Sequence, residues 1–532
     1  MTSQPFSMIG RTLATLLATA AIASSTAQAA DTQAPVRAID LDLARAGEPL
    51  DRSFDLSVGA DYPGTLIRPD SLAQLDTAVN ELGFRYVRFH DIFTDALGTV
   101  QRRNDKIVYD WTKIDQLYDA LLARGIKPFV ELGFTPGPLK TSPQTIFYWK
   151  GNTSHPRIEE WGKLVDAFVR HLRDRYGAEA VRGWFFEVWN EPNLDGFWEK
   201  ADKAAYLELY ETSARTIKAI DPALRVGGPA TAGAAWVPDL LDHAAAKNIP
   251  IDFVTTHTYG VDGGFLDEKG EDDNKLSTNP DSVVGDVRRV REQIAASKFP
   301  TLPLYFTEWS ASYNPRDPVH DSYVSAPFIL SKLRATRPYA QGMSYWTYSD
   351  LFEEAGPPPT PFHGGFGLMN REGIRKPAWF AYKYLHMLHG REVPSTDTQV
   401  LATTDKGQTG VLLWNWQQPA QTVSNRPFFT KLLPATPSAD AEIRLSHLTP
   451  GRYRVAVRRT GYQANDAHSR YLEMGSPKSL TPAQIGELQA LTRDAPEMQR
   501  TVQVGRDGRY VLRVKMRSND VVLATLEPES KR

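Results

Sequence analysis

Between residues 54 and 390, short apolar runs rich in β-branched and aromatic residues alternate with longer stretches that have the spacing of amphipathic helices. The apolar runs predict eight strands, at residues 54–60, 86–92, 127–134, 184–190, 225–229, 253–259, 303–309 and 342–349. The longer stretches predict eight helices, at residues 71–82, 113–124, 158–176, 203–220, 237–247, 283–298, 323–336 and 377–388. This repeated strand-then-helix unit predicts an α/β fold, the (β/α)8 TIM barrel.

An open, doubly wound sheet is the alternative that the same alternation allows. Such a sheet usually holds a nucleotide phosphate at a glycine-rich turn. Here no G-x-G-x-x-G follows the first strand, and no G-x-x-x-x-G-K-[ST] occurs anywhere in the chain. The missing phosphate-binding turns favour the closed barrel, and no cofactor is expected.

Beyond residue 390 the pattern changes to shorter strand-like runs. They predict strands at 400–404, 411–416, 443–445, 453–457, 510–515 and 521–526. Short strands at this spacing favour a small antiparallel β-sandwich. A helix is predicted to begin at Thr481-Pro482, where threonine can cap the helix and proline can take its first position. Asp507-Gly508 predicts a hairpin turn.

This change of pattern predicts two domains. Residues 54–390 are expected to form the barrel, and residues 391–532 a smaller C-terminal β-sandwich accessory domain. The N-terminal segment 30–53 contains the alternating run 36–41, which predicts one more strand of the sandwich, contributed from the other end of the chain.

Residues 1–29 have the pattern of a secretory signal peptide. One basic side chain, Arg11, precedes an uncharged stretch of leucines and small residues that ends in Ala27-Gln28-Ala29, a typical cleavage tripeptide. The alternative is a membrane anchor, but a spanning helix needs about 20 mostly apolar residues, and this stretch is diluted by threonine and serine. We therefore predict a secreted or periplasmic protein without a membrane span in its mature part.

Charge and cysteine content exclude several classes of function. The chain has 61 Lys and Arg against 63 Asp and Glu, a net charge of −2, and no cysteine. This balance lacks the basic excess that attracts nucleic acid or an acidic membrane surface. Without cysteine there can be no disulfides, thiolate zinc sites, iron–sulfur clusters or cysteine nucleophiles.

Two carboxylates are expected at the mouth of the barrel. Active sites of such barrels lie at the carboxyl ends of the strands. The fourth predicted strand runs directly into Glu191, and the seventh ends around Glu308. Glycoside hydrolysis needs two carboxyl groups that face the anomeric carbon, one protonated and one ionised. Strands four and seven lie on roughly opposite sides of a barrel mouth, so this pair could flank a sugar.

Each carboxylate also has a structural interpretation. Glu191 could be a favourable charge at the start of a helix, and Glu308 could belong to an ion pair. Glu187 and Glu131 compete for the same roles, but both lie inside strands and are less well placed. The pairing on these two strands, with Asn190 before Glu191, favours catalysis.

Histidines and aromatic residues end other predicted strands. His90 and His257 end the second and sixth strands, where they could donate hydrogen bonds to hydroxyls or to a carboxylate. The alternative for each is a core histidine with its hydrogen bonds satisfied. Trp346 could stack under a sugar face or belong to the core, and Tyr259 and Trp309 are secondary candidates. No H-E-x-x-H is present, so a metal site is not expected.

Two long segments resemble the catalytic motifs of glycoside hydrolase family 39, the β-xylosidase family. They are WFFEVWNEPNLDGFW at 184–198 and FTEWSASYNPRDPVHD at 306–321. Further similar stretches are GFRYVRFHDIF at 83–93, FYWKGN at 147–152, THTY at 256–259, YWTYSDLFEE at 345–354 and HSRYLEMGSP at 468–477. The resemblance therefore extends from about residue 54 to the C-terminal domain.

The resemblance implies a retaining, exo-acting glycosidase that needs neither metal nor cofactor and acts on an oligosaccharide. It implies that Glu191 is the general acid/base and Glu308 the nucleophile, and that Asn190 binds the hydroxyl next to the anomeric carbon. It also implies a pocket for the terminal sugar lined by His90, Phe147, His257, Trp346 and Glu354, with Tyr259 as a further candidate on the strand-end argument.

The expected activity is that of a β-1,4-xylosidase acting on xylo-oligosaccharides. One departure from the family pattern affects substrate choice, because Trp309-Ser310 follows the nucleophile where a pair such as Phe-Asn is common. An α-L-arabinoside, an α-L-iduronide or an exopolysaccharide is the alternative substrate, and a non-catalytic carbohydrate-binding protein is the alternative function. The acidic stretch 261–281 follows the sixth strand and is expected to be a solvated loop that could cover the site.

Overall fold

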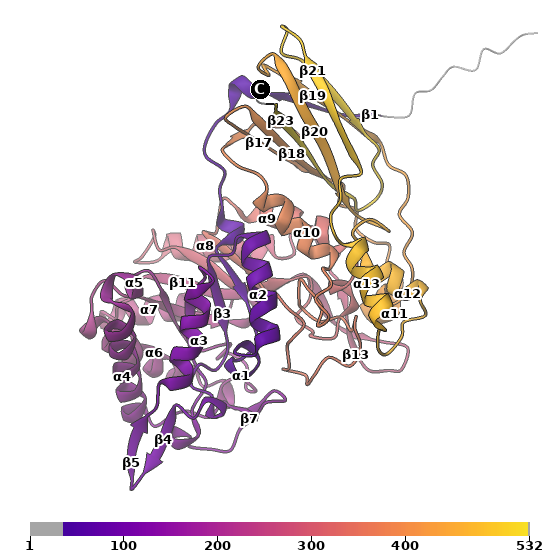
Figure 1. The fold of residues 1–532 in the computed structure, drawn as a ribbon. Helices are drawn as coiled ribbons and strands as arrows, with labels where there is room; N and C mark the ends of the chain where they lie inside the picture. The colour runs from indigo at the N-terminus through magenta and orange to yellow at the C-terminus, as the bar shows by residue number, and fades with distance from the viewer. Residues whose placement is uncertain (1–35, 530–532) are drawn as a thin grey trace, which may run out of the picture.

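The computed structural model describes residues 36–529 (Figure 1). It contains the predicted barrel, a closed ring of eight parallel strands. In order around the barrel the strands are β2 (Ser57–Gly59), β3 (Tyr86–Phe89), β6 (Lys127–Leu132), β9 (Phe185–Val188), β10 (Arg225–Thr231), β11 (Phe253–Tyr259), β14 (Leu304–Ser310) and β15 (Gly342–Tyr345). Each lies within or beside one of the predicted apolar runs, so the prediction of the fold class is confirmed.

The predicted helices cover the outside of the barrel. They are α2 (Pro69–Leu82), α3 (Thr112–Ala123), α4 (Ile158–Tyr176), α6 (Lys203–Ile220), α7 (Val237–Lys247), α8 (Val284–Ala296), α9 (Ser325–Thr336) and α10 (Pro377–His386). Helix α4 shows why these segments fold as they do. Its buried residues recur every three or four positions and form one apolar stripe: Trp161, Leu164, Val165, Phe168, Val169 and Leu172. Acidic residues in its first turn and arginines in its last complement the helix dipole.

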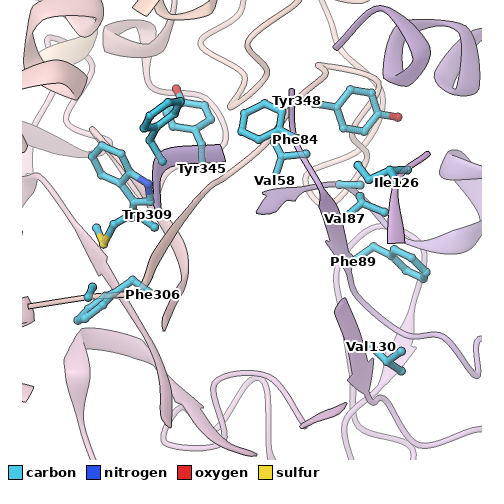
Figure 2. Close-up of a cluster of buried hydrophobic side chains, with 14 of the residues drawn as sticks. Val58, Phe84, Val87, Phe89, Ile126, Val130, Phe306, Trp309, Tyr345 and Tyr348 are labelled. Carbon is cyan, nitrogen blue, oxygen red and sulfur yellow. The ribbon is translucent and has the colours of Figure 1, made fainter. Parts of the chain in front are cut away.

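The alternation of side chains along the strands separates two layers of the molecule. On β3, Val87 and Phe89 point outward, and Phe89 meets the ring of Tyr118 on α3 with 6.4 Å between ring centroids. Figure 2 shows part of this outer layer, with Val58, Val87, Phe89 and Val130 on one side and Phe306, Trp309 and Tyr345 on the other. These buried residues join the strands to the helices that cover them.

Aromatic side chains fill the inside of the barrel at its amino end. Phe129, Phe185, Phe253 and Tyr305 come from four different strands and pack against one another, with Phe129 and Phe185 stacked at 4.5 Å. The next inward position on each strand lies two residues further along. Arg88, Glu131 and Glu187 lie two residues beyond Tyr86, Phe129 and Phe185 of the aromatic cluster and form a polar layer above it.

The C-terminal domain is a two-sheet sandwich, which Figure 1 shows in orange and yellow above the barrel. One sheet has the order β1 (Val36–Asp42), β19 (Asp440–Ser446), β22 (Tyr510–Val514). The other has the order β16 (Arg391–Val393), β17 (Val400–Asp405), β18 (Gln408–Trp414), β23 (Val521–Pro528), β20 (Gly451–Thr460), β21 (Met498–Val504). Ile39, Ile443 and Leu512 of the first sheet share a buried cluster with Val400 and Val455 of the second.

Two details of the sandwich differ from prediction. The sandwich is not wholly antiparallel, because β1, indigo in Figure 1, pairs parallel with β19. The hairpin predicted at Asp507-Gly508 is wrong, since β21 pairs with β20 and β22 pairs with β19. The turn there carries the chain from one sheet to the other. Gly508 has a φ of 63°, which explains the glycine.

Shorter elements complete the described residues. They are α1 (Pro63–Leu66), β4 (Val100–Arg103), β5 (Lys106–Tyr109), β7 (Thr145–Ile146), β8 (Gly151–Asn152), α5 (Ala178–Arg182), β12 (Val261–Leu266), β13 (Asp272–Leu276), α11 (Asn425–Phe429), α12 (Ala467–Glu473) and α13 (Pro482–Leu491). Helix α13 begins with the predicted threonine cap, and Gln484 completes a capping box with Thr481. In Figure 1, α11, α12 and α13 extend from the sandwich alongside the barrel.

The predicted signal peptide, residues 1–29, lies outside the described residues. Across residues 36–529, none of the helices is both long and apolar enough to span a bilayer.

Candidate active site

Arg88 organises the polar layer inside the barrel. Its side chain is fully buried, and its guanidinium donates to Glu187 Oε2 at 2.5 Å, Glu308 Oε1 at 2.7 Å and Asn190 Oδ1 at 2.9 Å. Glu131 Oε2 lies 2.9 Å from the same group. Burial alone would lower the pKa of Arg88, but the surrounding glutamates raise it above its ordinary value. Arg88 is therefore a fixed positive charge beneath the site.

Glu191 reaches the site through an unusual backbone conformation just beyond β9. Its φ is 46°, and that of Trp189 is 72°, a left-handed region that non-glycine residues rarely adopt. The Glu191 N–H donates to the carbonyl of Ala230 at 2.8 Å, which holds this turn against the end of β10. The turn takes Glu191 out of the strand alternation and places its carboxyl group in a cavity. Strained backbone of this kind is concentrated at functional sites.

Glu308 projects from β14 toward Glu191. Its two oxygens have different partners, because Oε1 accepts from Arg88 and Oε2 accepts from the Tyr259 hydroxyl at 2.8 Å. His257 Nδ1 lies 2.9 Å from Glu191 Oε1 and 3.7 Å from Glu308 Oε2. One carboxylate oxygen of Glu191, one of Glu308 and one ring nitrogen of His257 lie within 4.8 Å of one another. The two carboxylates that were predicted from the sequence thus face each other, with His257 beside them.

The surroundings favour the neutral forms of Glu191 and His257. Burial, followed by the negative charge of Glu308, raises the pKa of Glu191 well above its ordinary value. Burial, followed by the positive charges of Arg88 and His90, lowers the pKa of His257 well below its ordinary value. A protonated carboxyl group at Glu191 is what a general acid requires.

His90 links the polar layer to the opposite wall of the cavity. Its Nδ1 lies 2.8 Å from Glu131 Oε2, and its Nε2 lies 3.2 Å from Glu354 Oε1. Burial would lower the pKa of His90, but the charge of Glu131 and its hydrogen bond raise it well above the ordinary value. Phe147 stacks on the His90 ring, with 5.7 Å between centroids and 18° between planes.

Trp346 forms a wall of the cavity directly beyond β15. It lies over Gly59 of β2, where a Cβ atom would come within 2.1 Å of the indole Cε3. Only glycine at this position leaves room for the ring. Trp346 also lies beside His90 and over the Arg88 guanidinium.

The cavity bounded by these residues has a volume of about 460 Å³, within the usual range for ligand pockets. Of the predicted site residues, His90, Asn190, Glu191, Tyr259, Glu308, Trp346 and Glu354 line it. Phe147 and His257 touch lining residues instead. Sequence reasoning did not single out Arg88 or the lining residues Leu194, Phe197, Ala232, Gly233, Thr258, Val261, Asp286, Tyr313 and Phe366. The only available signal for Arg88 was a charged residue two positions before His90 in a strand.

The acidic stretch after β11 is a folded hairpin, β12–β13, and not a simple solvated loop. Val261 at its start lines the cavity. Asp267 and Asp273 are buried, and both accept hydrogen bonds from Arg426 of α11. Asp267 accepts from the Arg426 side chain, and Asp273 accepts from its backbone N–H. Asn425 accepts from the Leu276 N–H at 3.0 Å. The C-terminal domain thus holds this hairpin in place.

A closed (β/α)8 barrel with two facing carboxylates at the carboxyl ends of its strands has the architecture of a barrel glycoside hydrolase. Comparison with known families is more specific. The model of Glycosyl hydrolases family 39 matches residues 37–510, and the chain belongs to this family.

Individual relatives agree over most of the chain. A beta-xylosidase of Caldicellulosiruptor saccharolyticus is 37% identical over 436 residues, which cover 81% of this chain and 86% of that protein. The crystal structure of a monomeric beta-xylosidase from Caulobacter crescentus CB15 is 66% identical, with a TM-score of 0.92, covering 93% of this chain and 100% of that one. The GH39 enzyme from Xanthomonas axonopodis pv. citri has the same identity and TM-score, covering 93% and 98%.

Proposed function

We propose that this protein is a retaining, exo-acting β-1,4-xylosidase that releases xylose from the non-reducing ends of xylo-oligosaccharides. The observation that carries the proposal is the closeness of two carboxylates, since one oxygen of Glu191 lies within 4.8 Å of one oxygen of Glu308. Retaining glycosidases hold their carboxyl groups about 5–5.5 Å apart, whereas inverting enzymes need roughly 6.5–9.5 Å to admit a water. The names of the relatives described above support xylose as the sugar.

The proposed reaction has two displacements. In the first, the Glu308 carboxylate attacks the anomeric carbon while the Glu191 carboxyl group gives its proton to the departing glycosidic oxygen. A glycosyl ester on Glu308 results. In the second, the Glu191 carboxylate takes a proton from water, which attacks the same carbon and breaks the ester bond. Arg88 and Tyr259 hold the two oxygens of Glu308 by hydrogen bonds and orient it for attack.

The inner end of the cavity suits an uncharged sugar. The Nδ2 group of Asn190 is buried and has no hydrogen-bond partner among residues 36–529, so it is free to meet the hydroxyl next to the anomeric carbon. His90 and Glu354 present polar groups to other hydroxyls, and Trp346 offers an aromatic face. The described residues that line the cavity include no lysine or arginine, and both ring nitrogens of His90 already face carboxylates, those of Glu131 and Glu354, so an iduronate carboxylate would find no unpaired cation among them.

Hydrolysis of nitrophenyl β-D-xyloside followed by proton NMR tests the function and its stereochemistry together. We expect the first-formed xylose to be the β-anomer, and xylobiose to yield only xylose. Glu308→Gln should abolish turnover while sugar binding persists. An α-anomeric product, unchanged turnover in Glu308→Gln, or hydrolysis of arabinosides alone would reject the proposal.

We also propose that the protein is exported. The signal-peptide pattern of residues 1–29 supports export, and mass spectrometry of the mature protein should show an N-terminus at Ala30. An intact Met1 on protein recovered from outside the cytoplasm would contradict this.

The proposed mechanism uses no metal, although Glu191, His257 and Glu308 could hold an ion. A chelator should therefore leave activity unchanged.

A further inference from the structure

Burial divides the cavity into an inner and an outer end. At the inner end, Asn190, Glu308 and Trp346 are at most 4% exposed. At the outer end, Leu194 is 39% exposed and Tyr313 is 52% exposed. A substrate that fills the cavity therefore places one part deep in the barrel and the other part near the surface.

The outer end lies on the side of the proposed general acid. The Leu194 N–H donates to the backbone carbonyl of Glu191 at 3.0 Å, so Leu194 belongs to the turn that carries Glu191. A general acid protonates the glycosidic oxygen that joins the sugar to the leaving group. The outer end is consequently where the leaving group lies.

The polar side chains at the outer end already have protein partners. Asp286 accepts through Oδ2 from Thr258, which is 2% exposed and lies beneath it, at 2.6 Å, and Arg289 lies 2.8 Å from the other oxygen of Asp286. The Tyr313 hydroxyl donates to Asn274 Oδ1 at 2.8 Å. This contrasts with the Asn190 Nδ2 group at the inner end, which has no hydrogen-bond partner within the described part of the chain.

The remaining surface of the outer end is apolar. It consists of side chains of Leu194, Phe197, Ala232 and Val261 and the ring of Tyr313. A second xylose would lose water from its hydroxyls here and would meet few polar groups, all of them already hydrogen-bonded to the protein, which is unfavourable. An aromatic ring has no such requirement and gains by burial.

We propose, on the basis of the function proposed above, that the outer end is a site for an apolar, aromatic leaving group. The substrates that bind best are then aryl β-xylosides, in which a phenolic oxygen carries the xylose. Xylo-oligosaccharides are cleaved at the same carboxylates, but their second sugar contributes less to binding.

Inhibition by non-hydrolysable thioglycosides tests this without interference from leaving-group reactivity. Phenyl 1-thio-β-D-xyloside, methyl 1-thio-β-D-xyloside and 4-thioxylobiose would be compared as competitive inhibitors of nitrophenyl xyloside hydrolysis by the full chain. We expect the phenyl compound to bind about tenfold more tightly than the methyl compound, which corresponds to burial of roughly 55 Å² of ring surface. It should also bind more tightly than 4-thioxylobiose.

Two variants and a matched control locate the effect. Leu194→Asn and Val261→Thr place polar atoms on the outer surface with little change in size and should reduce the phenyl-to-methyl ratio by about threefold. Leu432→Asn makes the same change at a residue that is 41% exposed and lies outside the cavity lining, and should leave the ratio unchanged.

Equal inhibition by the phenyl and methyl compounds, or tighter binding of 4-thioxylobiose, would overturn the inference while the proposed function stands. Retention of the full ratio in both Leu194→Asn and Val261→Thr would also overturn it. If none of the three xylosides competes, or nitrophenyl xyloside is not hydrolysed, the proposed function itself fails.

Discussion

Glu191 and Glu308 have the same side chain, and their surroundings give them different proposed roles. Glu308 lies against the guanidinium of Arg88, a fixed positive charge. Glu191 has a neutral histidine as its nearest hydrogen-bond partner, and its pKa is raised by burial and by the charge of Glu308. In the proposed mechanism, Glu308 attacks the anomeric carbon and Glu191 gives the proton, and these surroundings suit both roles.

Leaving groups of different acidity should distinguish these roles. Glu191→Gln removes the proton donor, so hydrolysis of xylobiose should fall by about 10²–10⁴-fold. The first displacement of 2,4-dinitrophenyl xyloside should be affected much less, because dinitrophenolate departs without a proton. Single-turnover release of dinitrophenol measures this step. Glu308→Gln, in comparison, should lose both reactions. Equal losses for the two substrates in Glu191→Gln would contradict the assignment.

Asp61 gives a prediction about stability. It is buried beside the loop that carries Glu354, and its Oδ2 accepts from the Glu353 N–H at 2.8 Å. Burial raises the pKa of Asp61 to about 7 from 3.8. The folded state therefore binds this proton more tightly than the unfolded state, so the Asp61 contribution to stability falls as pH rises from about 4 to about 7.

Asp61→Asn keeps the shape of the side chain and removes the ionisation. We expect the variant to have a higher Tm than the parent at pH 8 and little difference at pH 4.5, as measured by thermal unfolding followed by circular dichroism. The reason is that only the parent must ionise a buried carboxyl group at the higher pH. A Tm difference that does not change between the two pH values would contradict the prediction.

At the scale of single residues, the sequence revealed the site only in part. Glu191 and Glu308 stand where apolar runs end, so their positions could be inferred from the strand pattern. Arg88 could not, because one charged residue in a strand usually faces solvent. It is buried here because Glu187, Asn190 and Glu308, distant in sequence, converge on it. Leu194 and Tyr313 belong to loops whose course no periodicity predicts.

At the scale of elements, the buried strands could be predicted from the sequence and the exposed strands were missed. Strands β6 and β9 are buried along almost their whole length and are mostly apolar in sequence, interrupted by Glu131 and Glu187. Strand β21 escaped prediction because most of its residues are exposed and polar. The hairpin β12–β13 also escaped prediction, since β12 is largely exposed and β13 is hydrogen-bonded to α11, about 150 residues later.

Asn425 of α11 allows a test of whether this helix stabilises the hairpin β12–β13. Asn425 is fully buried, accepts from the Leu276 N–H and donates to Asp317 Oδ2 at 2.8 Å. Asn425→Ala removes the Asn425 partner of the Leu276 N–H and of Asp317 Oδ2, and a third hydrogen bond from Gln421 Nε2, at a cost of about 1–3 kcal/mol. We expect faster amide hydrogen exchange across 261–276 and a higher KM with a smaller change in kcat.

Lys431→Ala, at an exposed position shortly after the same helix, serves as the control and should change neither quantity. Unchanged exchange across the hairpin in Asn425→Ala would show that α11 does not support it.

At the scale of the whole molecule, the chain begins its described course in the sandwich, builds the barrel and returns to the sandwich (Figure 1). The two parts also share apolar packing. Leu412, Trp414 and Leu523 of the sandwich belong to the same buried cluster as the barrel core, and Trp414 Nε1 donates to Ser331 Oγ of α9 at 2.8 Å. The division at residue 390 is a change of sequence pattern, and whether it separates independent folding units stays a prediction.

The shared core argues that the two parts unfold together, because exposing one part removes the surface against which the other packs. Calorimetry should show one transition with equal calorimetric and van't Hoff enthalpies. Trp414→Ala, which deletes a side chain that is 1% exposed, should cost about 3–5 kcal/mol and lower the Tm of that single transition. Leu491→Ala, at an exposed position of α13, should leave the Tm nearly unchanged. Two separate transitions, only one of which moves in Trp414→Ala, would show instead that barrel and sandwich fold independently.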